Sequence, residues 1–324
     1  MARCRMAVAV AAMLGLAAPA QAFDLQGHRG ARGLAPENTL VGFQRALAVG
    51  VTTLELDLVM TRDGALVVHH DLHLNPDLAR RDGAPIEPPG PAIRTLSVEE
   101  LRFYDVGRLK PDTAYARQFP AQVPADGAPV PTLQEVFALV RAHPEVKLNI
   151  ETKLTPTAGL DAPDPGTFAH AVAMAVRASG MADRVTVQSF DWRTLLVLKG
   201  IAPEIRRACL TSEGNPDTVG RRSRGASPWT AGFALRDFGD STPRLAGAAG
   251  CGVWSPASRD LTQARIAEAQ GLGMEVIPWT VNERTEMERL IGWGVDGIIT
   301  DYPDRLRAVM AARRMELPRR VTVR

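Results

Sequence analysis

Apolar and polar positions along this chain follow two alternating periods. Short apolar runs with strand character recur, and most are followed by a segment whose apolar residues have helical spacing. The expected strands cover residues 24–28, 53–60, 147–153, 184–190, 206–211, 251–255, 275–281 and 297–301. The expected helices cover residues 39–49, 133–142, 168–178, 192–199, 261–270, 284–293 and 304–314. Strands that alternate with helices in this way predict a parallel sheet.

Eight strands with intervening helices over about 300 residues fit an α/β fold of the TIM (β/α)8 barrel type. A doubly wound open sheet is the rival, but no G-x-G-x-x-G fingerprint follows the first strand. Two stretches interrupt the alternation. Residues 72–131 are rich in Pro, Gly and Asp, with one helical patch at 97–103, and residues 212–250 are rich in Gly, Ser, Pro and Arg. We therefore expect a barrel with a small insertion after the second strand, at about 72–131, and a long later loop.

The first 22 residues are set apart from the barrel by their composition. Arg3 and Arg5 precede an apolar run that ends in Ala-Gln-Ala at 20–22, the pattern of a secretory signal peptide cleaved before Phe23. The run is short for a membrane span, which disfavours the alternative of a retained anchor. We therefore predict a signal peptide at 1–22, a barrel domain at 23–324, and a periplasmic or secreted protein without a stable membrane anchor.

The charge balance and the cysteines restrict the partners. The chain has 38 basic and 36 acidic side chains, so loss of Arg3 and Arg5 leaves 36 of each and a net charge of zero. A protein without a basic excess lacks the electrostatic footprint of a nucleic-acid binder. Cys209 and Cys251 remain after cleavage, and an oxidising compartment permits a disulfide between them. Both lie in strand-like segments, so two buried free thiols are the alternative, and the oligomeric state stays open.

Two expected strands carry acidic side chains on one face. Glu55 and Asp57 are two positions apart in 53–60, and Glu151 lies between Asn149 and Lys153 on one face of 147–153. Neighbouring buried acids repel each other unless a proton or a cation joins them. Carboxylate oxygens are ligands of hard divalent cations, so these three acids predict a metal site. The alternatives are solvated acids on an edge strand and a structural salt bridge between Glu151 and Lys153.

Three histidines cluster in VVHHDLHLNPD, at 67–77. His69 and His73 have the spacing of a metal-binding pair on a helix. However, the Asp-Gly dipeptide at 63–64 predicts a two-residue hairpin turn, which makes VVHH a strand paired with 53–60. Counting back from that turn places His70 opposite Asp57, with His69 facing the other way. A one-residue bulge would shift this register. We therefore expect His70 beside the acids, and His73 at the rim of the pocket.

The first expected strand ends in Gly-His-Arg-Gly. A TIM barrel places its catalytic groups at the ends of its strands, so His28 and Arg29 fall at an active-site position. Two histidines can supply a general acid and a general base, and arginine suits bidentate contact with phosphate. Pro-Glu-Asn-Thr follows, in which Thr39 or Asn38 can cap the next helix and Glu37 can give polar support.

The motifs HRGARGLAPENT, ELDLVMTRDGALVVHHD, IETK, VQSF, WTVN and TDYP resemble the series of the glycerophosphodiester phosphodiesterase family. They occur in the family's order between residues 28 and 303. The resemblance implies a TIM barrel with a small insertion. It implies a divalent metal on Glu55, Asp57 and Glu151, an acid–base pair of His28 and His70, phosphate contacts from Arg29 and Lys153, and a pocket wall of Gln188, Phe190 and Trp279. The stretch 212–250 departs from the pattern by its length and its arginines.

The reaction implied by this resemblance is metal-dependent hydrolysis of a glycerophosphodiester to sn-glycerol 3-phosphate and an alcohol. Ca²⁺ is the favoured metal, because periplasmic calcium is abundant and all the ligands are oxygens, and Mg²⁺ is the alternative. A related enzyme, a lysophospholipase D or a sphingomyelinase-like phospholipase, is the second reading. A non-catalytic periplasmic phosphodiester-binding protein and a structural barrel with paired acids are readings of another class.

Overall fold

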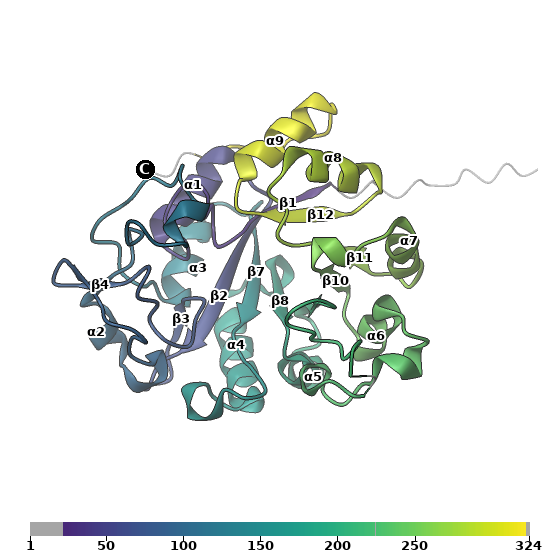
Figure 1. Ribbon diagram of the computed structural model, residues 1–324, viewed down its shortest axis with the longest axis horizontal. Coiled ribbons are helices and arrows are strands. Elements are labelled where there is room, and N and C mark those ends of the chain that lie inside the picture. Colours follow the sequence, from purple (N-terminus) through teal and green to yellow (C-terminus); the bar gives the residue numbers. More distant parts are fainter. Residues whose placement is uncertain (1–21, 224, 322–324) are drawn as a thin grey trace, which may run out of the picture.

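The computed structural model describes residues 22–223 and 225–321, and within them eight parallel strands form a barrel (Figure 1). The strands follow the order β11-β10-β9-β8-β7-β2-β1-β12. Backbone hydrogen bonds from Asp296 N to Val276 O and from Val281 N to Ile299 O, each 3.0 Å, join the two ends of this sheet. The predicted TIM-like fold is confirmed. The strands are β1 Asp24–Gly27, β2 Thr53–Met60, β7 Lys147–Thr152, β8 Val185–Ser189, β9 Arg206–Thr211, β10 Val253–Pro256, β11 Glu275–Val276 and β12 Gly297–Thr300.

Helices surround the strands (Figure 1). They are α1 Leu40–Val49, α3 Leu133–Arg141, α4 Pro165–Ser179, α5 Trp192–Ile201, α6 Thr242–Ala249, α7 Gln263–Gly271, α8 Arg284–Gly292 and α9 Pro303–Ala312. Thr39 caps α1, because its Oγ1 accepts a hydrogen bond from the Gly42 N–H at 3.0 Å. Helix α6 was not predicted. Its sequence TPRLAGAA has only eight residues, includes a proline and lies in a stretch rich in Gly, Ser, Pro and Arg, a composition that favours a loop.

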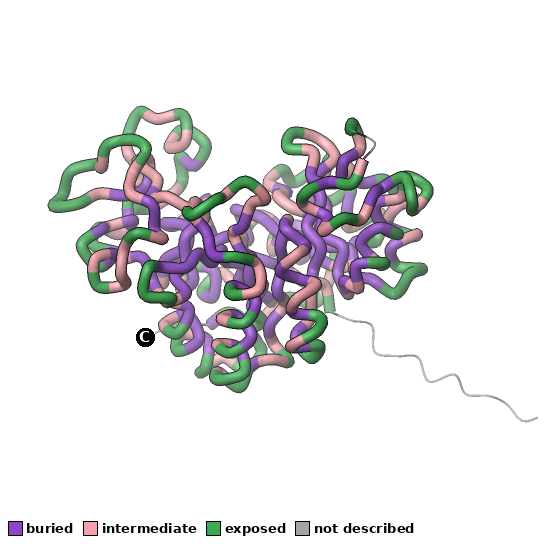
Figure 2. The backbone as a smooth tube through the Cα atoms, turned by 90° about the horizontal axis from the view of Figure 1, so that it is seen from below, coloured by how far each residue is buried: buried purple, intermediate pink, exposed green. Residues whose placement is uncertain are grey.

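Figure 2 shows buried backbone concentrated in the interior of the molecule, and both faces of strand β2 are buried. Leu54, Leu56 and Leu58 are fully buried in the main hydrophobic core, while Glu55 and Asp57 lie on the opposite face and are 0% and 1% exposed. A strand buried on both faces is typical of a parallel barrel. The alternative of an exposed edge strand with solvated acids is therefore wrong, and these acids lie inside the protein.

The hairpin after β2 corrects the predicted register. Thr61 N donates to Ala65 O at 3.0 Å, so the loop holds three residues, with Gly64 at φ +81°. A three-residue loop that ends in a left-handed residue shifts the pairing by one position. Strand β3, Leu66–Val68, pairs antiparallel with β2, and the His69 N–H donates to Asp57 O at 3.1 Å. His69, and not His70, is therefore opposite Asp57, and His70 lies beyond the end of β3.

The insertion at 72–131 has a small core of its own. It contains α2, Val98–Leu101, and a three-stranded antiparallel sheet of β4 Arg80–Arg81, β5 Ala84–Pro85 and β6 Tyr104–Asp105. Buried side chains from the insertion pack against the outer part of the hairpin, among them Leu74, Ile93 and Leu101. The insertion is thereby fixed against the rim of the barrel next to β2.

A disulfide joins Cys209 in β9 to Cys251, just before β10. The two residues are 42 positions apart and both are buried. Of the two possibilities that the sequence left open, the structure shows the disulfide. It encloses residues 212–250, the long segment that includes α6.

Replacement of Cys251 by alanine is expected to lower the free energy of unfolding by about 4 kcal/mol, the loop-closure value for a crosslink of this span. Urea unfolding of the variant and of the wild-type protein measures the difference. Wild-type protein held in a reductant should lose a similar amount, because it lacks the same crosslink. A loss below about 0.5 kcal/mol in both samples would show that the disulfide does not restrict the unfolded chain.

Candidate active site

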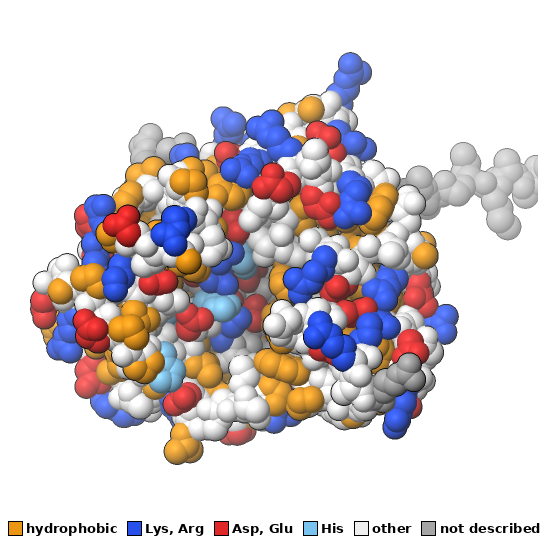
Figure 3. All heavy atoms as spheres, in the orientation of Figure 1, with side chains coloured by type: hydrophobic (Ala, Val, Ile, Leu, Met, Phe, Trp, Pro, Cys, Tyr) orange, Lys and Arg blue, Asp and Glu red, His pale blue; other side chains and the backbone are white. Residues whose placement is uncertain are grey.

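A cavity of about 240 Å³ opens at the C-terminal ends of the barrel strands. Figure 3 shows a hollow in this face, with histidine side chains on its wall. Active sites of TIM barrels lie at this end. Nine of the twelve site residues predicted from the sequence line the cavity: His28, Arg29, Glu55, His70, Glu151, Lys153, Gln188, Phe190 and Trp279. The three others, Glu37, Asn38 and Asp57, lie behind this surface and contact it.

Three carboxylates meet at the base of the cavity, two on its floor and Asp57 directly behind them. Glu55, Asp57 and Glu151 offer oxygen atoms that all lie within 4.8 Å of one another, and all three side chains are buried. Burial and the negative charges of Asp57 and Glu151 raise the pKa of Glu55 well above its usual value. Asp57 Oδ1 is buried and has no hydrogen-bond partner among the described residues. A group of three acids that includes an oxygen without a hydrogen bond provides the oxygen ligands that a hard divalent cation requires.

Two cations border the acids. Lys153 Nζ lies 2.7 Å from Glu151 Oε1 and 3.7 Å from Asp57 Oδ1, and Arg29 Nε lies 3.2 Å from Asp57 Oδ2. Burial opposes the ionisation of Asp57, but Arg29 and Lys153 outweigh it and hold the pKa of that carboxyl well below its usual range. The salt bridge between Glu151 and Lys153, which the sequence offered as a purely structural alternative, does exist. It nevertheless lies on the cavity wall, where an anionic group can reach the lysine.

The backbone around Arg29 is tightly constrained. Arg29 has φ +50°, a left-handed conformation that is rare for a residue with a side chain. Its N–H donates to Glu55 Oε2 at 2.7 Å, and its guanidinium donates to Glu37 Oε1 at 2.5 Å. A Cβ at Gly27 would lie 2.0 Å from Gly30 O, so this turn requires glycine. Strained backbone of this kind is found where a side chain is held for function.

His28 is held by the carboxylate of Asp301, the residue that directly follows β12. Its Nδ1 lies 2.6 Å from Asp301 Oδ1, and its Nε2 faces the acids, 4.0 Å from Glu55 Oε2. Arg32 and Asn282 also bind Asp301, at 2.9 Å and 2.7 Å. Burial and the positive charge of Arg32 lower the pKa of His28. A buried carboxylate on Nδ1 fixes the ring and leaves Nε2 for the cavity.

His70 has a matching arrangement on the other side of the acids. Its Nδ1 lies 2.6 Å from Asp71 Oδ1, and Asn75 binds the second oxygen of Asp71 at 2.8 Å. Burial, Lys153 and Arg29 lower the pKa of His70 to about 4. The other histidines of this segment do not line the cavity: His69 is buried behind it, and His73 is bound to Asp161 at 3.2 Å.

The opposite wall of the cavity is apolar. Phe190 and Trp279 meet edge to face, with ring centroids 5.3 Å apart, and Leu210 and Ile299 complete the wall. Trp229, from the long segment after β9, makes a further edge-to-face contact with Phe190 at 6.3 Å. The cavity therefore has a charged half that suits an anion and an apolar half that suits the rest of a larger ligand.

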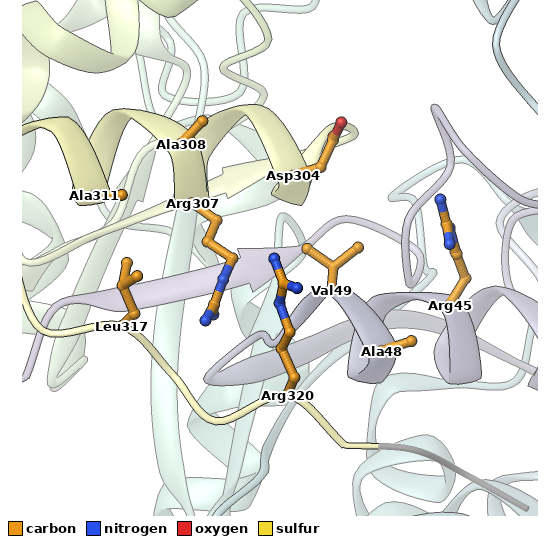
Figure 4. Close-up of a pocket in the computed structure, with 9 residues that line it drawn as sticks. All are labelled: Arg45, Ala48, Val49, Asp304, Arg307, Ala308, Ala311, Leu317 and Arg320. Carbon is orange, nitrogen blue, oxygen red and sulfur yellow. The ribbon is translucent and has the colours of Figure 1, made fainter.

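A larger cavity of about 430 Å³ lies outside the barrel, between α1, α9 and the segment at 317–320 (Figure 4). Arg307 and Arg320 lie side by side within it, and Arg45 extends from α1. It contains one acid, Asp304, and no histidine. The chemistry of the side chains therefore favours the smaller cavity as the active site.

A model of the glycerophosphoryl diester phosphodiesterase family matches residues 28–305. The chain belongs to this family. A glycerophosphodiester phosphodiesterase of Caldanaerobacter subterraneus is 28% identical over 279 residues, which span 86% of this chain and 94% of the relative. The phosphodiesterase family resemblance deduced from the motifs is thus confirmed.

Two solved structures have the same fold. A protein of Silicibacter pomeroyi, described as a candidate glycerophosphoryl diester phosphodiesterase, is 33% identical with a TM-score of 0.81, over 91% of this chain and 95% of its own. A phosphodiesterase of Oleispira antarctica, solved with the product sn-glycerol-3-phosphate, is 20% identical with a TM-score of 0.64, over 88% and 96%.

The sequence patterns did not predict several residues of this site. Asp301 and Asn282 lie in the quoted motifs TDYP and WTVN, but no role was expected for either. Their proximity to His28 results from barrel closure, which joins the first and last strands. The end of a strand in a TIM barrel is the one signal that could have identified Asp301. Arg32 was also missed, although it lines the cavity.

Proposed function

We propose that this protein hydrolyses glycerophosphodiesters to sn-glycerol 3-phosphate and an alcohol, with a divalent metal at the three carboxylates. The observation that carries the proposal is the pair of carboxylate-bound histidines, His28 and His70, on the wall of a cavity whose floor holds Glu55 and Glu151. Binding alone does not require a matched acid and base. The Oleispira relative, which was solved with sn-glycerol-3-phosphate, supports the choice of product.

The carboxylate group suits the proposed metal. Glu55, Asp57 and Glu151 would hold it through oxygen atoms, and Asp57 Oδ1 accepts no hydrogen bond among the described residues, although Lys153 lies 3.7 Å away. Such an ion supplies positive charge to the phosphodiester oxygens. Both Ca²⁺ and Mg²⁺ prefer oxygen ligands. Ca²⁺ is the first choice because calcium is abundant in the periplasm, and Mg²⁺ is the second.

Each side chain has a proposed role. Arg29 and Lys153 bind the phosphate and stabilise the charge that develops on its oxygens. His28 acts as the general base on the attacking hydroxyl, which belongs either to the substrate's own glycerol or to water. His70 acts as the general acid and protonates the departing alkoxide, because the negative charge of the bound phosphodiester offsets Lys153 and Arg29, which otherwise lower the pKa of His70. Asp301 and Asp71 position the two rings through their Nδ1 atoms.

The direct test is incubation of the purified protein with glycerophosphocholine and Ca²⁺ or Mg²⁺. We expect sn-glycerol 3-phosphate and choline as products, detected by an enzyme-coupled assay for each. Phosphocholine as the product would mean that the other ester bond breaks, and this would overturn the proposal. No turnover with either metal would contradict it as well.

The apolar wall of the cavity favours a second candidate, a lysophospholipase D. Phe190 and Trp279 offer a surface on which an alkyl chain can pack. Lysophosphatidylcholine in the same assay separates the two functions. Turnover of the lysolipid without turnover of glycerophosphocholine would favour this second candidate.

Replacement of Tyr115 by phenylalanine is expected to raise KM for a phosphodiester about 3- to 10-fold, with little change in kcat. The Tyr115 hydroxyl, from the insertion, donates to Glu37, which in turn binds Arg29. Loss of this hydroxyl removes one hydrogen bond, worth about 1 kcal/mol, from the group that holds Arg29 in place. Tyr302→Phe is the matched control, because the Tyr302 hydroxyl also reaches the insertion, at Gln118 O, but does not contact Glu37. An equal rise in KM for both variants would contradict the proposed coupling.

We also propose that the protein works in the periplasm or outside the cell. The predicted signal peptide at 1–22 falls almost entirely outside the described residues. The disulfide between Cys209 and Cys251 supports an oxidising compartment. Among the described residues, no helix has both the length and the apolar character that a membrane span requires. N-terminal sequencing of the mature protein, expected to begin at Phe23, tests the cleavage.

A further inference from the structure

A chain of buried amide side chains crosses the interior of the barrel below the active site. It begins at Asp24 in β1, whose Oδ2 accepts from Gln26 Nε2 at 2.8 Å. Asn149 Nδ2, in β7, donates both to Gln26 Oε1 at 2.8 Å and to Gln188 Oε1 at 2.9 Å. Gln188 Nε2, in β8, then donates to Glu55 Oε1 at 2.9 Å. The chain thus connects two carboxylates, one at each end of the barrel interior.

The direction of these hydrogen bonds is fixed by the two carboxylates. The carboxyl groups at the two ends of the chain both accept from an amide N–H, as an ionised carboxylate must. The direction must therefore reverse once between Asp24 and Glu55. It reverses at Asn149, whose amino group supplies both donors, while its Oδ1 has no partner among the described residues. Asn149 thereby forces Gln188 to present its amino group, and not its carbonyl oxygen, to Glu55.

Burial makes this arrangement difficult to change. Gln26, Asn149 and Gln188 are each no more than 3% exposed, so water cannot replace a lost partner at low cost. If Gln188 turned over, two oxygen atoms would face each other at Glu55 in a dry environment. The cost of an unpaired buried polar group keeps the amides in one orientation.

We propose that Asn149 is a positioning residue for the metal site, and that it acts through Gln188 to hold Glu55 as a ligand. This inference rests on the proposed function, because it takes Glu55 to be a metal ligand. Asn149 neither lines the cavity nor belongs to the group of three carboxylates, although it is the cross-strand partner of Glu55, and the sequence had assigned it no role beyond its place on the strand face. Partners that orient metal ligands are worth about 10- to 100-fold in metal affinity.

The test is titration of purified Asn149→Leu with Ca²⁺ alone in a calorimeter. We expect a Kd for Ca²⁺ about 10- to 100-fold weaker than that of the wild-type protein. Asn149→Ser keeps a single short hydroxyl and carries less risk to folding, and we expect it to weaken binding in the same direction. Circular dichroism and the Tm in EDTA establish that each variant is folded.

Gln26→Leu is the matched control. It removes an equally buried amide from the same chain, but on the side away from Glu55, and Asn149 still donates to Gln188. We expect its Kd to lie within about 3-fold of the wild-type value, a difference under 1 kcal/mol. Wild-type affinity in both Asn149 variants, or equal weakening in Gln26→Leu, would overturn the inference alone. A wild-type protein that binds neither Ca²⁺ nor Mg²⁺ would instead overturn the proposed function on which it rests.

Discussion

Replacement of His70 by alanine is expected to lower kcat for glycerophosphocholine by about 10²- to 10⁴-fold, the usual contribution of a positioned acid or base. His28→Ala should lose a similar factor. Both rings line the cavity while a carboxylate holds their Nδ1 atoms, so removal of either ring removes a positioned acid or base. KM should change little, because Arg29 and Lys153 still provide the positive charge for the phosphate. Steady-state kinetics with each variant measure both quantities.

His73→Ala is the control for these variants. It lies three residues after His70, but it binds Asp161 and the Gly90 carbonyl and does not line the cavity. We expect kcat within about 3-fold of the wild-type value, a difference under 1 kcal/mol in activation free energy. Turnover that survived in both His28→Ala and His70→Ala would exclude acid–base catalysis by this pair.

Removal of divalent metal with EDTA is expected to abolish hydrolysis and to lower the Tm. The three carboxylates lie within 4.8 Å of one another in a buried site, and burial with mutual repulsion raises the pKa of Glu55. A cation at this site replaces that repulsion with attraction. At a metal concentration 100 times the Kd, binding stabilises the folded state by about 2.7 kcal/mol. Scanning calorimetry with and without EDTA measures the shift, and Ca²⁺ or Mg²⁺ added back should restore both activity and Tm.

Two substitutions distinguish the effect of losing metal at the three carboxylates from general effects of the chelator. Glu151→Gln removes one proposed ligand and should reduce both the rise in Tm on adding Ca²⁺ and the rate of hydrolysis. Glu286→Gln removes an acid in α8 that pairs with Arg289 at the surface, and it should behave as the wild-type protein. Full activity in EDTA together with an unchanged Tm would favour the reading in which the acids serve only salt bridges.

The barrel was predictable from the sequence because its strands are buried on both faces and separated by amphipathic helices. Helix α6 was not, since it is short, includes Pro243 and lies in a stretch rich in Gly, Ser, Pro and Arg. The hairpin register was wrong by one residue, because Asp63-Gly64 belongs to a three-residue loop. His70 was nevertheless the correct residue to place in the cavity. It is oriented there by Asp71 beyond the end of β3, and not by strand pairing.

Contacts between distant parts of the chain account for most of what the sequence did not predict. Asp301 is 273 positions from His28, and Tyr115 is 78 positions from Glu37. Periodicity within one strand indicates which side chains share a face, as it did for Glu55 and Asp57. It does not indicate which loop reaches across to a given side chain, and both contacts depend on how the barrel closes and where the insertion packs.

Different segments of the chain contact the two halves of the cavity. The insertion contacts the charged half through Tyr115, whose hydroxyl donates to Glu37. The disulfide-enclosed segment at 212–250 contacts the apolar half through Trp229. If the proposed function holds, such a division would allow the preference for the alcohol to diverge during evolution while the phosphate contacts are retained. For protein engineering, it directs libraries for new head groups to the surroundings of Trp229.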